Sequence, residues 1–214
     1  MKKNIYPVII LLSMLLASCQ EHIDYEGITD YEVGDIVIRN GAIIPYNQYM
    51  EQKRNDAMAV VYVTQRDVAD LPSKALAIYI GELTYCTFSD TLTSLGCSTD
   101  TAAYNGYENT LKLRTSSGSA LGNQMNFILP DNHNAFIPSV AEILPLHSSI
   151  AKVNAVLKSV GGTAIKTDSP DCWYWTSTEM NVLDAYTYSP TSNLLLPAVK
   201  TLPYSARPIF KVNY

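Results

Sequence analysis

The chain has 214 residues, of which 47% are hydrophobic and 16% are charged, and its 15 basic and 20 acidic residues give a formal charge of −5 at pH 7. Binding to nucleic acid phosphates needs a basic face, so this balance excludes nucleic acid as an expected partner. The length favours one domain behind a short leader, since domains commonly hold about 100–200 residues.

The N-terminus predicts a lipoprotein signal peptide over residues 1–18. Lys2 and Lys3 precede an apolar run at 5–16 that is too short to span a bilayer comfortably. The run leads into Leu-Ala-Ser-Cys, which resembles the bacterial lipobox, so we expect Cys19 to be acylated and residues 19–32 to form a polar tether. The alternative is an ordinary secretory signal that leaves Cys19 as a loop thiol.

The leader and the residues after it also predict a location. Loss of Lys2 and Lys3 takes the 15 basic residues to 13 against 20 acidic ones, a formal charge of −7. Gln20 rather than Asp follows the cysteine, and an acidic lead-in comes next. By similarity to Gram-negative lipoproteins, we expect a protein held by its lipid anchor on the outer membrane, at the cell surface.

The domain is expected to run from residue 33 to residue 214 and to begin with strands. Two apolar runs flank Asn40-Gly41, the strongest short-range signal for a β-hairpin. Segment 57–64 is apolar on both faces, which suits a strand in the middle of a sheet, and 76–80 is its predicted neighbour. Residues 84–104, rich in Ser, Thr, Asp and Gly, predict an irregular insertion.

The cysteines and histidines give weaker signals. Cys86 and Cys97 form a candidate disulfide around the insertion, but spacing does not fix connectivity, so pairing with Cys172 or three buried free thiols stay open. There is no Cys-x-x-Cys, and the histidines lie far apart in sequence, so we expect no zinc and no cofactor. The Asp and Asn cluster at 131–134 favours a turn over a calcium site.

Three segments predict helices: 105–113, a short stretch after Ser139, and 150–160. The first carries Tyr107 and Leu111 on one face, and residues 116–122 are expected to end it. Ser139 and Glu142 have the spacing of a capping box, in which each side chain satisfies a backbone amide at the helix start. The third has one apolar stripe and a Gly-Gly stop.

Segment 172–179 contains both tryptophans of the chain and predicts a central strand. Side chains alternate along a strand, so Trp173 and Trp175 share one face. We expect Trp175 in the core and Trp173 as the better candidate for stacking on a sugar ring. Segment 184–188 is its predicted partner strand, whereas 193–199 is expected to be an apolar connection.

The candidate ligand-binding residues are Trp173 and three neighbours on the same strand: Tyr174, Ser177 and Thr178. Glu179 and Arg207 are predicted to form a structural ion pair between two strands. We expect no catalytic residues and no enzyme, because the chain lacks Gly-x-Ser-x-Gly, His-Glu-x-x-His and a phosphate-binding loop, and a lone carboxylate has little chemistry.

Four separated blocks resemble one family. Asn-Gly-Tyr-Glu-Asn-Thr at 105–110, Ile-Pro-Ser-Val-Ala-Glu-Ile at 137–143, Tyr-Trp-Thr-Ser-Thr-Glu at 174–179 and Ala-Arg-Pro-Ile-Phe at 206–210 resemble, in this order, blocks of the bacterial C-type-lectin-like domain at the C-terminus of collagen-like adhesins, with departures at Ile137 and Thr176. Related domains occur in fimbrial and surface lipoproteins. The resemblance runs from about Gly34 to the C-terminus.

The resemblance implies an α+β fold of the C-type-lectin-like kind, with mixed, mostly antiparallel sheets and two or three short helices. The calcium and sugar signature of vertebrate C-type lectins is absent, so calcium-dependent binding does not carry over. The function expected is a non-catalytic, lectin-like adhesin for an extracellular glycan or protein. The alternative is a structural or assembly subunit of a fimbria-like fibre, with other fimbrial subunits as partners.

Overall fold

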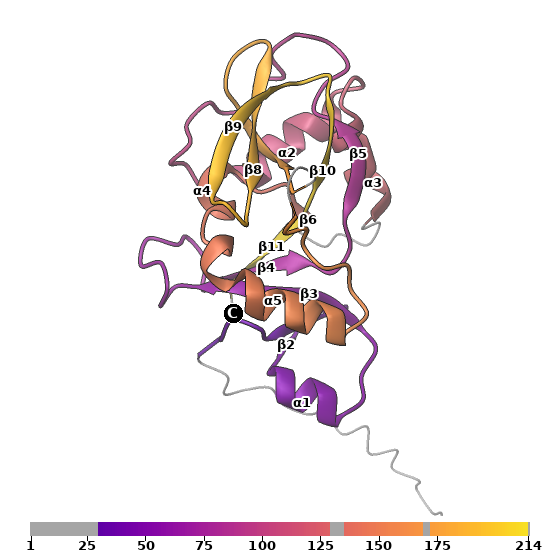
Figure 1. The fold of residues 1–214 in the computed structure, drawn as a ribbon, viewed down its shortest axis with the longest axis vertical. Helices are drawn as coiled ribbons and strands as arrows, with labels where there is room; N and C mark the ends of the chain where they lie inside the picture. The colour runs from indigo at the N-terminus through magenta and orange to yellow at the C-terminus, as the bar shows by residue number, and fades with distance from the viewer. Residues whose placement is uncertain (1–29, 129–134, 169–171, 214) are drawn as a thin grey trace, which may run out of the picture.

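Two β-sheets form the scaffold of the chain in a computed structural model, which describes residues 30–128, 135–168 and 172–213 (Figure 1). A six-stranded sheet has the order β2-β1-β3-β4-β11-β6, and a five-stranded sheet has the order β5-β10-β7-β8-β9. The strands of the first sheet are β1 (Ile36–Ile38), β2 (Ile43–Ile44), β3 (Ala57–Thr64), β4 (Ala75–Tyr79), β6 (Ala135–Phe136) and β11 (Ile209–Val212). Those of the second are β5 (Leu83–Thr87), β7 (Tyr174–Glu179), β8 (Asp184–Ser189), β9 (Leu194–Val199) and β10 (Pro203–Ala206).

Helices flank both sheets: α1 (Tyr46–Glu51), α2 (Gly106–Thr115), α3 (Ala120–Ile128), α4 (Val140–Ile143) and α5 (Leu146–Ser159). In Figure 1, α5 lies across the six-stranded sheet and packs on β3, while α2 and α3 pack on β7 and β5 of the other sheet. Helices and mostly antiparallel sheets therefore give the α+β class that the sequence predicts. Within the described ranges, no helix combines the length and apolar character needed to cross a membrane.

The core has two parts because the central strand β3 is buried on both faces. Val60 and Tyr62 face a first cluster that includes Leu157 of α5, whereas Val61 faces a second cluster that includes Trp175. All eight residues of β3 are buried. The continuous apolar run at 57–64 reflects this position, since a strand covered on both sides has no polar face to alternate with.

Several predicted elements are confirmed. The Asn40-Gly41 segment joins β1 and β2, with Ile36 opposite Ile44, and β4 pairs with β3 as its neighbour. β8 pairs antiparallel with β7. The capping box at Ser139 opens α4. In α5 the predicted stripe faces the first cluster, and the chain leaves the helix through Gly161 at φ +75°, a backbone conformation that glycine adopts without strain.

Other predictions are wrong. The segment 84–104 is not irregular throughout, because β5 occupies its start, and 193–199 is the edge strand β9 rather than a connection. A second helix, α3, begins inside the predicted break at 116–122. Tyr107 and Leu111 are exposed, because α2 buries the opposite face through Asn109 and Leu113. Contacts with the rest of the fold, and not the spacing of residues within the helix, determine which face of α2 is buried.

The C-terminal strands link the two sheets. β10 lies in the five-stranded sheet, parallel to β7 with Ser205 opposite Tyr174, and Arg207 and Pro208 then carry the chain into β11 of the six-stranded sheet. Pro208 falls directly before a strand, in agreement with the expectation for a residue without an amide hydrogen. This crossing places Arg207 between the two sheets.

Candidate functional site

A hollow of about 400 Å³ opens beside Trp173, and we call it the Trp173 hollow. Its walls come from the start of β5, the start of β10, and the segments that precede β7. The lining residues are Glu82, Thr84, Tyr85, Lys166, Trp173, Pro203, Tyr204 and Ser205. Its size lies in the range of small-molecule sites, and three aromatic rings with a charged floor give it both apolar and polar surface.

A β-bulge shapes one wall of the hollow. β5 and β10 pair with Cys86 opposite Tyr204 and Leu83 opposite Ala206, so Thr84 and Tyr85 together stand opposite Ser205 alone. Tyr85 has φ +54°, which is unfavourable for a side chain with a Cβ. Its side chain is 84% exposed. Bulges redirect side chains, and this one holds a large ring out in solvent at the mouth of the hollow.

The floor is a hydrogen-bonded network around Glu82, whose side chain is only 4% exposed. Lys166 Nζ lies 2.9 Å from Glu82 Oε1, and Ser205 Oγ donates to the same oxygen at 2.9 Å. Tyr174 OH donates to Glu82 Oε2 at 3.2 Å. Lys166 Nζ also donates to Ser205 Oγ at 3.1 Å. Each carboxylate oxygen therefore has a protein partner, which fixes the Glu82 side chain in one orientation.

Arg207 lies behind this floor and does not pair with Glu179, so that prediction is wrong. Its Nε is 3.5 Å from Glu82 Oε2, and its terminal nitrogens donate to the carbonyls of Tyr79, Gly81 and Thr163. Ser205 is level with Tyr174 at the start of β7 and the chain then leaves this sheet for β11, whereas Glu179 lies at the other end of β7. Burial lowers the pKa of Arg207.

Glu179 instead pairs with Lys200, and both side chains are almost fully buried. Lys200 Nζ lies 2.7 Å from Glu179 Oε1 and also donates to the carbonyls of Thr93 and Val182. Glu179 accepts further hydrogen bonds from Ser94 Oγ and Leu95 N–H. The pair joins three connections, 88–105, 180–183 and 200–202, at one end of the five-stranded sheet. Its role is structural, although its partner differs from the predicted one.

The four predicted ligand-binding residues separate into two groups. Trp173 is partly exposed and lines the hollow, but Tyr174, Ser177 and Thr178 are buried. Ser177 N–H donates to Pro138 O, and Thr178 Oγ1 accepts from Val140 N–H, so the polar tail of the strand holds the start of α4. The prediction that Ser177 and Thr178 contact a ligand is therefore wrong. Tyr174 is part of the floor network through its hydrogen bond to Glu82, and burial raises the pKa of Tyr174.

Trp175 is in the core, as predicted. It is 1% exposed, its indole Nε1 donates to Cys86 O at 2.8 Å, and its ring meets Tyr204 edge to face at 5.2 Å between centroids. β7 thus sends Trp175 inward, while Trp173, directly before the strand, lies at the rim of the hollow. Tyr204 connects them, since it packs on Trp175 and also lines the Trp173 hollow.

The candidate disulfide is absent: Cys86, Cys97 and Cys172 are all unpaired and buried in the described part of the chain. Cys86 Sγ faces Thr84 O within β5, whereas Cys97 Sγ faces Asn109 O of α2, so the two thiols belong to different local contacts. The alternative of three buried thiols fits the structure. Burial raises the pKa of Cys86 to about 12, with a smaller effect from the Glu82 charge, and burial raises that of Cys97 to about 12.

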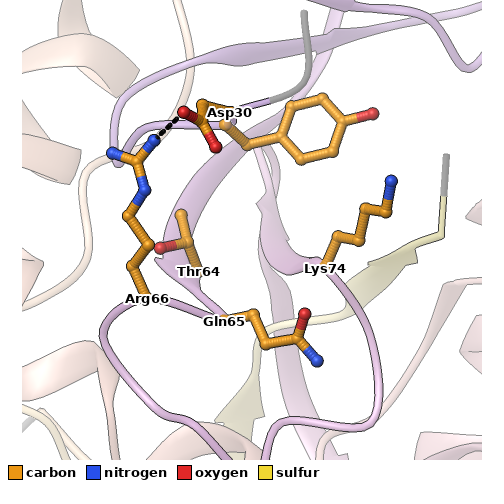
Figure 2. A pocket seen from close by; sticks show the side chains of 6 residues that line it. Asp30, Thr64, Gln65, Arg66 and Lys74 are labelled. Atoms are coloured by element: carbon orange, nitrogen blue, oxygen red, sulfur yellow. Dashed lines mark ion pairs between the residues drawn. The ribbon is translucent and has the colours of Figure 1, made fainter.

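A second, smaller hollow of about 270 Å³ lies at the ends of β3 and β4 (Figure 2). Asp30 and Arg66 point toward each other and form an ion pair, while Lys74 lies on the other side of the opening. Thr64 and Gln65 complete the labelled wall. Arg66 and Asp30 are largely exposed, so solvent screens this pair, and the hollow lacks the buried floor of the first.

Several predictions fall on residues outside the described ranges: the signal peptide at 1–18, the acylated Cys19 with most of the tether at 19–32, and the turn at 131–134. Among the described residues, no group of three His, Cys, Asp or Glu side chains could hold a metal ion.

Sequence reasoning missed most of the Trp173 hollow. Glu82 and Tyr85 lie close together in sequence but Lys166 is far from both, and the three belong to no motif. The one local sign was Gly81-Glu82, an acidic residue directly after a buried strand, which is a common position for a functional side chain.

The comparisons with known proteins give one similarity. No protein-family model and no curated protein matches the sequence. A crystal structure of a fimbrial protein from Bacteroides ovatus superposes with a TM-score of 0.58 and 17% sequence identity, over 84% of this chain and 48% of that one. This chain therefore spans about half the length of the fimbrial protein, and the two share a fold.

Proposed function

We propose that this chain is a cell-surface component of a fimbria-like fibre and acts there as a structural or assembly subunit. The observation that carries the proposal is the fold shared with the Bacteroides ovatus fimbrial protein. The predicted leader and lipobox add an outer-membrane anchor at Cys19. Radiolabelled palmitate should enter the full chain and should not enter a Cys19→Ser variant; equal labelling of both would remove the anchor from the proposal.

The edge strand β9 is where a neighbouring subunit would pack. Leu194 and Leu196 are 51% and 49% exposed, and Val199 is exposed on the same strand. The adjoining turn adds exposed Val182 and Leu183. Several exposed apolar side chains along an open sheet edge are unfavourable in an isolated monomer and are typical of surfaces that another chain covers.

A fibre-incorporation assay tests the proposal. Surface fibres sheared from cells that express the full chain should contain it, and Leu196→Glu should reduce its amount in the fibre fraction at least tenfold. Leu111→Glu is the matched control, because Leu111 is also an exposed leucine but lies on α2. Wild-type protein that stays wholly in the membrane fraction, in cells that make fibres, would refute the role.

The second candidate function is a lectin-like, non-catalytic binding domain of the C-type-lectin-like kind. The Trp173 hollow favours it, because exposed aromatic rings beside fixed polar groups suit the faces and hydroxyls of sugars. Glu82 is poorly placed to act as a catalytic acid or base, because protein groups contact both of its carboxylate oxygens. Saturable binding of a saccharide on a glycan array tests this function.

A further inference from the structure

We propose that the Trp173 hollow binds a saccharide that carries a single carboxylate, such as a hexuronic or sialic acid residue. The inference rests on the second candidate function, ligand binding at the cell surface, and goes beyond it by naming the ligand class. It is independent of the fibre role. Four features of the hollow carry it: the charge balance of its floor, the hydrogen-bond donors at its walls, its aromatic walls, and the strained position of Tyr85.

The charged groups in the floor and directly behind it carry more positive than negative charge. Lys166 and Arg207 both approach Glu82, at 2.9 Å and 3.5 Å, and Glu82 is the one acidic residue among the described residues that line the hollow. Two cations that share one buried carboxylate leave one positive charge to be balanced. A bound monoanion would balance it through a charge-assisted hydrogen bond, which is stronger than a neutral one.

The groups that remain available to a ligand are mainly donors. An ammonium has three N–H donors, and within the described residues Lys166 donates one to Ser205 Oγ and points its charge at Glu82 in an ion pair, which leaves a third N–H. Its side chain is 40% exposed, so the third can reach a ligand. The Trp173 indole N–H has no acceptor in the described part of the chain. Donors without acceptors favour an oxygen-rich ligand with a negative charge.

The aromatic walls select a ring over an extended polyanion. Tyr85, Trp173 and Tyr204 line the hollow from three segments of the chain, and flat apolar ring faces stack on the faces of sugars. The chain as a whole is acidic, at −5, which disfavours a polyanion such as nucleic acid or polyphosphate. A sugar ring with one carboxylate offers a face for stacking and carries a single negative charge, so it satisfies both conditions.

The backbone at Tyr85 gives independent support. A non-glycine residue at φ +54° is strained, and a tyrosine that is 84% exposed gains little from burial in return. Fold stability alone would favour glycine at this position of the bulge. A role of the Tyr85 ring in covering a ligand at the mouth of the hollow explains why an exposed tyrosine occupies this strained position.

The test compares acids with their neutral esters. Calorimetric titration of the full chain, in detergent, uses methyl glucuronide and N-acetylneuraminic acid together with the methyl ester of each. We expect the acid to bind at least tenfold more tightly than its ester, and this preference to shrink as NaCl is raised, since salt screens the charge. Lys166→Met should bring the acid and ester within twofold of each other, and Lys166→Arg should keep the preference.

Two further variants separate binding from folding. Tyr85→Gly should weaken binding of the acid at least tenfold while the melting temperature stays the same or rises. Lys74→Met, in the second hollow, should leave binding unchanged. Equal affinity for acid and ester would overturn the acidic ligand while leaving saccharide binding in place. No binding of any saccharide, or equally tight binding of an acidic peptide, would overturn the lectin-like function as well.

Discussion

Replacement of Lys200 by methionine should destabilise the fold strongly, because Lys200 is a fully buried cation with three partners. Its Nζ lies 2.7 Å from Glu179 Oε1, 3.0 Å from Thr93 O and 2.9 Å from Val182 O. Methionine is nearly as long but cannot donate a hydrogen bond. The variant would leave two carbonyls and a carboxylate that is 2% exposed without their cation.

Removing one partner of a buried ion pair costs about 3–5 kcal/mol, because the remaining charge stays desolvated. That is a large part of the about 5–15 kcal/mol that separates folded from unfolded states of a domain. For a domain of this size each kcal/mol corresponds to about 2–4 °C, so the melting temperature should fall by about 6–20 °C. Adding Glu179→Gln to Lys200→Met removes the unpaired charge and should restore about 2 kcal/mol.

Urea unfolding followed by tryptophan fluorescence measures these differences, since Trp175 is in the second core cluster, in the same strand as Glu179. Arg66→Met is the control: it removes one partner of the exposed pair with Asp30 and should not change the midpoint measurably. A loss below about 1 kcal/mol in Lys200→Met would refute the view that this pair holds the end of the sheet.

Three further predictions concern other buried groups. Arg207→Met should lower the unfolding free energy by about 3–5 kcal/mol in denaturant titrations, because three carbonyls lose a charged donor, and an unchanged midpoint would contradict this. The thiols of Cys86 and Cys97, both with a pKa of about 12, should react with Ellman's reagent at pH 8 only after unfolding; two thiols fewer than expected in unreduced, unfolded protein would indicate a disulfide. Burial raises the pKa of Glu142 above its ordinary 4.5, so the folded state holds this proton more tightly than the unfolded state, and this contribution to stability is lost as pH rises through the raised pKa. As the pH rises above 4.5, Glu142→Gln should therefore lose less stability than the wild type in thermal melts across a pH series, and parallel pH profiles would count against it.

The sequence predicted elements whose signals are local. Asn40-Gly41 specifies a tight turn by its backbone preference, and the Ser139 and Glu142 pair specifies a helix start through hydrogen bonds across three residues. The continuous apolar run at 57–64 predicted burial on both faces. In each case the physical cause lies within a few residues of its effect, so no knowledge of the rest of the fold was needed.

The missed elements depend on distant contacts. β9 has the composition of an apolar connection, and only its pairing with β8 makes it a strand. The predicted pair of Glu179 with Arg207 failed for a similar reason, because the parallel register of β10 and β7 decides which charges meet, and that register is not visible in either segment alone. The Trp173 hollow gathers residues from position 82 to position 205, so only one rim residue was found in advance.

The proposed fibre contact and the proposed ligand site lie at opposite edges of one sheet, so the two proposals are compatible in one subunit. The order β5-β10-β7-β8-β9 places the bulge of Tyr85 on one edge strand and Leu196 on the other. Four strand spacings of about 4.8 Å separate them by about 19 Å, enough for a neighbour on β9 to leave the hollow open. Leu196→Glu should lose fibre incorporation and keep binding of the acidic saccharide, and Tyr85→Gly should do the reverse. If either variant lost both activities while keeping the wild-type melting temperature, the two surfaces could not be independent, and the hollow would have to be part of the contact between subunits.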